Sequence, residues 1–229
     1  EFRERTYCYA SVALLSCQLQ DHTAKFVSNL FTGADMKGFL IFLLLLVGGL
    51  LFSGAKWFDD FPIGSKLEGF SMPNPSGEMR DYKELKGKNG TLVVFLSAQC
   101  PVVKMYNQRI EALANAYKEK GISLIGIYSN NTESAEWVMQ HSSENYSFPV
   151  LIDKENVFAD KLSASFTPEV YYFDADDSLQ YHGAIDNDRS GKNITKLYLT
   201  DALEEALAEK PITQQVTRAF GCTIKRVKN

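Results

Sequence analysis

The chain has 229 residues, of which 45% are hydrophobic and 23% are charged, with a formal net charge of −4 at pH 7. This length leaves room for one domain with extensions. The apolar fraction excludes a largely disordered chain or a collagen-like fibre, and the acidic balance provides no basic surface for nucleic acid. The 4 cysteines are too few for a small scaffold held together by disulfides.

An uncharged apolar run, FLIFLLLLVGGLLF, occupies residues 39–52. As a helix it would span roughly 21 Å, short of the roughly 30 Å hydrocarbon core of a membrane. Met36 and Lys37 precede the run and small residues follow it, which is typical of a secretory signal peptide. We predict a signal peptide over residues 36–55, with an uncleaved membrane anchor as the alternative. Met36 is then the expected start, and residues 1–35 are interpreted as an upstream segment that is not native to the protein.

The remainder is predicted to form one domain over residues 56–210 and a polar, flexible tail over 211–229. Turn residues at 72–77 suit a hairpin, which a short helix at 81–85 follows. Apolar runs at 91–97 and 122–128 predict buried strands, and helical spacing predicts a helix over 101–120 between them. A helix at 134–141, a strand at 148–152 and a helix at 155–162 come next.

The last part of the predicted domain is a hairpin followed by a helix. Strands at 170–173 and 179–184 flank an acidic turn, and an amphipathic helix is expected over 197–208. The order of elements predicts an α/β fold, with a central mixed sheet flanked by helices and an N-terminal extension. The acidic loop at 186–189 is interpreted as a solvated loop rather than a metal site.

Cys100 is placed where the first long strand ends and the first long helix begins. Unpaired N–H groups and the dipole at a helix start favour negative charge, and therefore thiolate over thiol. Thiolate is the nucleophile in disulfide exchange. Pro101 suits an early helical position, where no N–H is needed, and Lys104 one turn later is a candidate for supporting the thiolate. We therefore predict a reactive cysteine rather than a small buried apolar residue.

Residues 62–210 resemble the thioredoxin-like superfamily, specifically its redoxin branch (the alkyl hydroperoxide reductase/thiol-specific antioxidant group). The run VVFLSAQCPVVK resembles the strand–cysteine–helix signature, and Thr167-Pro168-Glu169-Val170 resembles the cis-proline segment. The Cys-Pro-x-x-Lys start and Gly-Cys-Thr-Ile-Lys at 221–225 are similar to a peroxiredoxin-like subgroup. The resemblance implies a thioredoxin-like fold and a cis Pro168. It also implies that Thr167 and Pro168 lie beside Cys100, where a partner chain could pair.

The chain departs from both families in residues that their activities need. Val103 stands where thioredoxins carry the second cysteine, and Val94 stands where they carry a buried acid. The peroxiredoxin Pro-x-x-x-Thr-x-x-Cys pattern is absent before Cys100, and no Arg occurs between Arg109 and Arg189. Without Thr and Arg donors to polarise the O–O bond, we expect weak or no peroxidase activity.

Disulfide exchange needs a second thiol to resolve the mixed disulfide. Cys8 and Cys17 lie in the upstream segment and are excluded from the chemistry, so Cys222 is the remaining candidate partner for Cys100. Three alternatives remain open from the sequence. Cys222 resolves an attack by Cys100, or the two form a permanent structural disulfide, or they never meet. The tail could fold back, and the residues after Cys222 could add an edge strand.

The leading hypothesis is an exported thiol–disulfide oxidoreductase, periplasmic or extracellular, that uses Cys100 and Cys222. Its expected partners are protein or small-molecule thiols and disulfides and a reductant such as a thioredoxin-type donor. We expect no cofactor, no metal and no nucleic acid, and a membrane contact only if the signal segment stays uncleaved. The alternative is a non-enzymatic thioredoxin-fold binding module. Copper delivery is disfavoured because Lys104 stands where a Cys-x-x-x-Cys motif would have its second cysteine.

Overall fold

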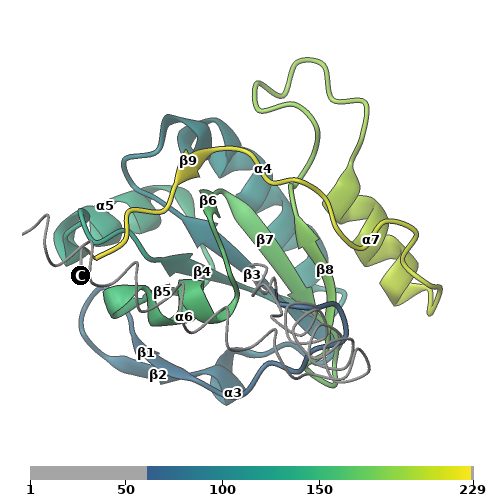
Figure 1. The fold of residues 1–229 in the computed structure, drawn as a ribbon, viewed down its shortest axis with the longest axis horizontal. Coiled ribbons are helices and arrows are strands. Elements are labelled where there is room, and N and C mark those ends of the chain that lie inside the picture. Colours follow the sequence, from purple (N-terminus) through teal and green to yellow (C-terminus); the bar gives the residue numbers. More distant parts are fainter. Residues whose placement is uncertain (1–60, 228–229) are drawn as a thin grey trace, which may run out of the picture. The chain divides into compact units, whose positions relative to one another are not determined.

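The computed structural model describes residues 61–227. The predicted signal segment at 36–55 and the upstream segment at 1–35 lie outside the described residues. A central sheet of five strands has the order β5-β4-β3-β7-β8 (Figure 1). These strands are β3 (Gly90–Leu96), β4 (Ile122–Tyr128), β5 (Val150–Ile152), β7 (Glu169–Phe173) and β8 (Leu179–Gly183). β3 pairs in parallel with β4 and antiparallel with β7, so the sheet is mixed, as predicted.

Helices cover both faces of this sheet (Figure 1). The helical elements are α3 (Tyr82–Leu85), α4 (Pro101–Lys118), α5 (Ala135–Asn145), a 3-10 turn (Lys154–Asn156), α6 (Val157–Lys161) and α7 (Tyr198–Leu207). The short strands β1 (Ser71–Pro73) and β2 (Met79–Asp81) form the expected hairpin. Two further short strands, β6 (Phe166–Thr167) and β9 (Cys222–Thr223), pair with each other outside the main sheet.

The alternation of side chains along β3 explains why its sequence is apolar throughout. Leu92, Val94 and Leu96 pack in one core with side chains from α4, α5 and α7. Val93 and Phe95 pack in a second core with side chains from α3, α6 and the first hairpin. Because successive strand residues point to opposite faces, a sheet covered on both sides needs this continuous apolar run.

The predicted elements are present, with shifted ends. α5 extends to Asn145, beyond the predicted 141, and the predicted helix at 155–162 is a 3-10 turn joined to the short α6. Asn156, with φ of 60°, interrupts the helical backbone between these two pieces. The two-residue strands β6 and β9 escaped prediction as a pair because neither is long enough to show a period.

The C-terminal segment is not a flexible tail within the described residues, and that expectation is wrong. It leaves α7, crosses one end of the sheet and continues past β6 (yellow in Figure 1). His182 in β8 exchanges backbone hydrogen bonds with both Gln215 and Thr217. Further along, the Ile224 amide donates to the Ser165 carbonyl at 3.0 Å, and the Ile224 side chain is buried. The segment is therefore a fixed part of the domain.

Candidate active site

Cys100 lies at the N-cap of α4, as the sequence predicted, and Pro101 is the first helical residue. Only 2% of the Cys100 surface is exposed. Its amide donates to the Ser97 hydroxyl oxygen at 3.0 Å, and its Sγ lies 3.3 Å from the carbonyl oxygen of Thr167. The sulfur is thus held between the start of α4, where N–H groups lack helical partners, and the segment that contains Pro168.

Cys222 lies against Cys100, and the two form a disulfide with Cα atoms 5.9 Å apart. This excludes the alternative in which the two cysteines never meet. The pairing of β9 with β6 brings them together, because Cys222 lies directly opposite Thr167 in the antiparallel register. Gly221 is required here, since a Cβ at this position would come within 2.0 Å of the Thr167 carbonyl oxygen.

The peptide bond between Thr167 and Pro168 is cis, as the resemblance implied. Thr167 is only 1% exposed, and its hydroxyl donates to the Cys222 carbonyl oxygen at 3.4 Å. The buried carboxylate of Glu169 accepts the amides of Ser165 at 2.7 Å and Phe166 at 2.9 Å. The backbone edge at Thr167 is therefore formed as predicted, but β9 of the same chain already pairs with it.

The carboxylate of Glu133, which the sequence analysis missed, binds the turn that leads into Cys100. It accepts the Ser97 hydroxyl at 2.5 Å, the Ala98 amide at 3.2 Å and the Gln99 amide at 3.1 Å. Parallel pairing of β3 with β4, with Leu96 opposite Tyr128, brings the segments that follow both strands to the same edge of the sheet. Glu133 is an acidic residue shortly after β4, the strand next to β3, and this position is the sequence signal from which the contact could have been predicted.

Lys104 is exposed one turn into α4 and lines a surface groove of about 420 Å³ beside the Cys100 turn. Trp137 and His141 of α5 line the same groove. His141 is 8% exposed, and its Nδ1 lies 2.7 Å from the hydroxyl of Tyr128. Burial lowers the pKa of His141, which favours the neutral ring. The Lys104 amide donates to the Cys100 carbonyl oxygen at 3.1 Å, a backbone bond of the helix, so the role expected for the lysine side chain stays a prediction.

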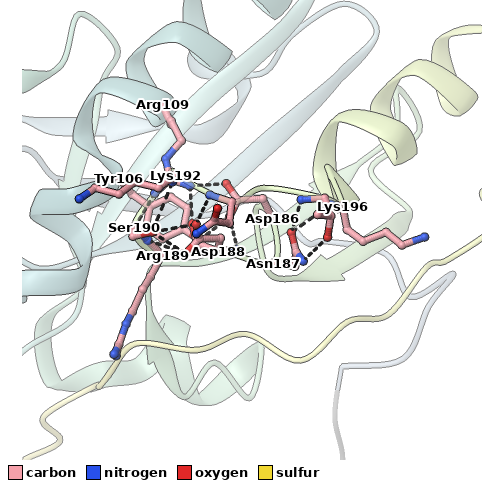
Figure 2. Close-up of polar contacts among 11 residues, drawn as sticks. Tyr106, Arg109, Asp186, Asn187, Asp188, Arg189, Ser190, Lys192 and Lys196 are labelled. Atoms are coloured by element: carbon pink, nitrogen blue, oxygen red, sulfur yellow. Dashed lines mark hydrogen bonds and ion pairs between the residues drawn. The ribbon is translucent and has the colours of Figure 1, made fainter.

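A second polar cluster joins α4 to the loop between β8 and α7 (Figure 2). The Asp186 carboxylate is 1% exposed, accepts the Tyr106 hydroxyl at 2.7 Å and forms an ion pair with Arg109. Arg109 also donates to the carbonyl oxygens of Asp188 at 2.9 Å and Arg189 at 2.6 Å. The interpretation of this segment as a solvated loop is therefore wrong for Asp186, which anchors the loop to the helix.

Within residues 61–227, no group of three or more His, Cys, Asp or Glu side chains is placed to hold a metal ion. In the same part of the chain, no helix combines the length and apolar character needed to cross a membrane.

Known proteins are similar to this chain in sequence and in architecture. It is 29% identical over 143 residues to a thiol-disulfide oxidoreductase of Bacillus cereus, ResA, covering 60% of this chain and 80% of ResA. It is 27% identical over 113 residues to the thioredoxin-like protein YneN of Bacillus subtilis, covering 48% of this chain and 65% of YneN.

Among solved structures, an uncharacterized conserved protein from Geobacillus kaustophilus matches with a TM-score of 0.69 and 29% identity, over 75% of this chain and 95% of that one. A hypothetical protein from Sinorhizobium meliloti matches with a TM-score of 0.68 and 27% identity, over 75% and 98%. A putative thioredoxin from Neisseria meningitidis shares the fold, with a TM-score of 0.51 and 21% identity over 63% and 91%. The model of the AhpC/TSA family matches residues 63–182, more than half of the chain. This protein therefore belongs to the AhpC/TSA family, with a thioredoxin-like fold.

Proposed function

We propose that this protein is an exported thiol–disulfide oxidoreductase that attacks through Cys100 and resolves through Cys222. The observation that carries the proposal is the disulfide between these residues at the start of α4, next to Thr167 and the cis Pro168. The similarity to a thiol-disulfide oxidoreductase of Bacillus cereus supports it. Export rests on the apolar run at 39–52 and the small residues that follow it.

The chemistry follows from two thiols in contact. In the reduced protein, the Cys100 thiolate attacks one sulfur of a substrate disulfide, forming a mixed disulfide and releasing the other substrate sulfur as a thiolate. The Cys222 thiolate then attacks the Cys100 sulfur, releases the second substrate thiolate and leaves the Cys100–Cys222 disulfide. Two electrons have passed to the substrate, and an external dithiol, such as a thioredoxin-type donor, must return them.

The start of α4 supports Cys100 as the attacking thiol. Unpaired N–H groups and the helix dipole lower the pKa of a cysteine at this position, with Pro101 as the first residue of the helix. Cys222 lies in a two-residue strand with no such helix start. Thr167 and Pro168 would bind the polypeptide around a substrate disulfide once β9 moves, while Lys104 would add positive charge nearby.

Peroxide reduction is not the activity we propose. Ser97, Ala98 and Gln99 stand before Cys100 in place of the peroxiredoxin Thr pattern, and the Ala98 and Gln99 amides bind Glu133. Arg109 in α4 is paired with the buried Asp186. Polarising the O–O bond needs donors directed at the peroxide, which these interactions do not supply.

Trapping of mixed disulfides tests the assignment. Cys222→Ser should accumulate a mixed disulfide between Cys100 and an added disulfide-containing protein such as insulin, while Cys100→Ser should accumulate little. The wild-type protein with dithiothreitol should reduce insulin disulfides, and both variants should lose this turnover. Equal trapping by the two variants would reject the order of attack.

The second candidate is a binding module in which the disulfide is a structural link. The low exposure of Cys100 and the pairing of β9 along Thr167 favour it, because both keep partners away from the sulfur. Equilibration with glutathione buffers separates the two candidates. A structural disulfide has a reduction potential below about −300 mV and stays oxidised in these buffers, whereas a catalytic disulfide has a higher reduction potential and becomes reduced in them.

A further inference from the structure

We propose that Glu133 is a positioning residue for Cys100: it holds the turn before the cysteine, and its negative charge keeps the thiol less acidic than the helix start alone would make it. The proposal rests on the redox use of Cys100 proposed above. Glu133 lies outside the Cys100 segment, on the loop after β4, and in this role it regulates the reactivity of the thiol.

The hydrogen bonds of Glu133 support its role in positioning the turn before Cys100. Oε1 of Glu133 accepts the Ser97 hydroxyl and the Gln99 amide, while Oε2 accepts the Ala98 amide. Ser97 in turn accepts the amide of Cys100 through the same hydroxyl oxygen, at 3.0 Å. Four consecutive residues, from Ser97 to Cys100, are therefore connected to one carboxylate. The turn cannot change its path without breaking charge-assisted hydrogen bonds, which are among the stronger ones in proteins.

The charge of Glu133 opposes the effect of the helix start on Cys100. Two hydrogen bonds through the Ser97 hydroxyl connect the Glu133 carboxylate to the Cys100 amide, and a negative charge close to a thiol disfavours the thiolate and raises the pKa of the thiol. Glu133 also accepts the hydrogen bonds of the Ala98 and Gln99 amides, and the dipoles of these amides could otherwise stabilise the thiolate. The negative charge of Glu133 and its hydrogen bonds to these two amides therefore both disfavour the thiolate form of Cys100.

Other charged groups lie near this turn. Lys104 on α4 carries positive charge and Glu144 on α5 carries negative charge, and both line the groove beside Ala98 and Gln99. Lys225 follows β9, and its amide donates to the Asn130 side chain, which in turn donates to Glu133. Burial lowers the pKa of His141, which favours its neutral ring, and burial raises the pKa of the Tyr128 phenol on β4. The charge of Glu133 also acts to raise the pKa of both His141 and Tyr128. Matched variants are therefore needed to assign a change in the thiol to the Glu133 carboxylate.

The pH dependence of Cys100 alkylation by iodoacetamide tests the proposal in the Cys222→Ser background, where Cys100 is free. Glu133→Gln removes the charge and keeps the side-chain length and one acceptor oxygen for the Ser97 hydroxyl and the Gln99 amide, while its NH2 group replaces the oxygen that accepts the Ala98 amide. We expect it to lower the pKa of Cys100 by about half a unit to one unit, so that alkylation well below the pKa becomes about three- to tenfold faster. Glu136→Gln is the matched control, because it removes an exposed carboxylate from the first turn of α5.

Glu133→Asp provides the second variant, since it keeps the charge but shortens the reach of the side chain. It should not lower the pKa of Cys100, although it should loosen the turn and reduce thermal stability. An unchanged or raised pKa in Glu133→Gln would overturn the proposal, as would an equal fall in Glu133→Gln and either Glu133→Asp or Glu136→Gln. Alkylation needs no disulfide substrate. A shifted pKa without insulin reduction would therefore reject the oxidoreductase function while leaving the role of Glu133 intact.

Discussion

The two cysteines reach the same point by different structural means. Cys100 lies between a seven-residue buried strand and an eighteen-residue helix, and its position follows from the regular elements on either side. Cys222 lies in a two-residue strand, held by backbone pairing with Phe166–Thr167 and by contacts of the residues that follow it. The Asn130 side chain accepts the Lys225 amide at 2.7 Å, and Arg226 donates to the Ala164 carbonyl at 2.7 Å.

The site has a Cys100 half, at the junction of β3 and α4, and a Cys222 half, formed by β9 and the residues that follow it. The difference between them indicates which half can move while the fold stays intact. Moving Cys100 would require a shift of β3 or α4, which together supply much of both hydrophobic cores. Moving Cys222 would break a few hydrogen bonds, each worth about 1 kcal/mol, and would uncover Ile224. In the function proposed above, the Cys222 half is therefore the part that would move to let a substrate pair with the edge at Thr167.

The largest expected effect comes from removing the covalent link between the two halves. Cys222→Ser opens a cross-link between positions separated by 122 residues. In the chain-entropy account, this lowers the free energy of unfolding by about 3–5 kcal/mol. Urea denaturation of oxidised wild type and variant measures the loss. A loss below about 1 kcal/mol would show that the non-covalent contacts of the C-terminal segment hold it almost unaided.

The next effect should come from the close approach of the two short strands. Gly221→Ala places a Cβ within 2.0 Å of the Thr167 carbonyl oxygen, so β6 and β9 must separate. We expect a loss of about 2–4 kcal/mol in the free energy of unfolding and a weaker disulfide in glutathione buffers. Gly69→Ala is the control, because nothing lies within 4 Å of a Cβ built there. Similar behaviour of the two variants would contradict the requirement for glycine at 221.

A smaller effect should follow from loosening the segment beyond Cys222. Arg226→Ala removes the exposed ion pair with Asp160 and the hydrogen bond to the Ala164 carbonyl oxygen. We expect a loss of about 0.5–1 kcal/mol and a severalfold weaker disulfide in glutathione buffers, because Cys222 is held less firmly near Cys100. Lys161→Ala, which removes the exposed ion pair with Glu68 elsewhere, should leave the disulfide equilibrium unchanged. An equal shift in both variants would show that Arg226 has no special part in holding Cys222.

The smallest expected effect is the pH dependence of stability due to His141, which lines the groove beside the Cys100 turn. Burial lowers the pKa of His141 in the folded protein, so folding favours the neutral ring. The stability that depends on this ring is present above its unfolded pKa, about 6.5, and is lost as pH falls through the lower folded value. Unfolding free energies measured from pH 7.5 down to pH 5 should therefore decline more in wild type than in His141→Gln. Parallel pH profiles would exclude His141 as a contributor.

The sequence predicted the Cys100 half well because its signals are local. Long apolar runs and helical spacing are visible within one window, and they placed Cys100 at the start of α4. The Cys222 half could not be predicted in the same way. Its pairing with Thr167 depends on a contact between distant segments, and a two-residue strand has no period to recognise.

The contacts that escaped prediction share this long-range character. Glu133 reaches the Cys100 turn only because β3 and β4 are parallel and in register. Asp186 was interpreted as a solvated loop residue, yet Tyr106 and Arg109 on α4 bind it. A carboxylate in a polar loop gives no local sign that a helix far away along the chain buries it.

The separation of the two cysteines along the chain also sets the order in which the site is completed during synthesis. A ribosome makes Cys100 and all five strands of the main sheet before it reaches Cys222, since β8 ends at Gly183. At roughly 5–20 residues per second, the 122 positions between the cysteines take about 6–24 s to make. Throughout that interval Cys100 has no intramolecular partner at the Thr167 edge. During this time, the disulfide with Cys222 cannot yet form.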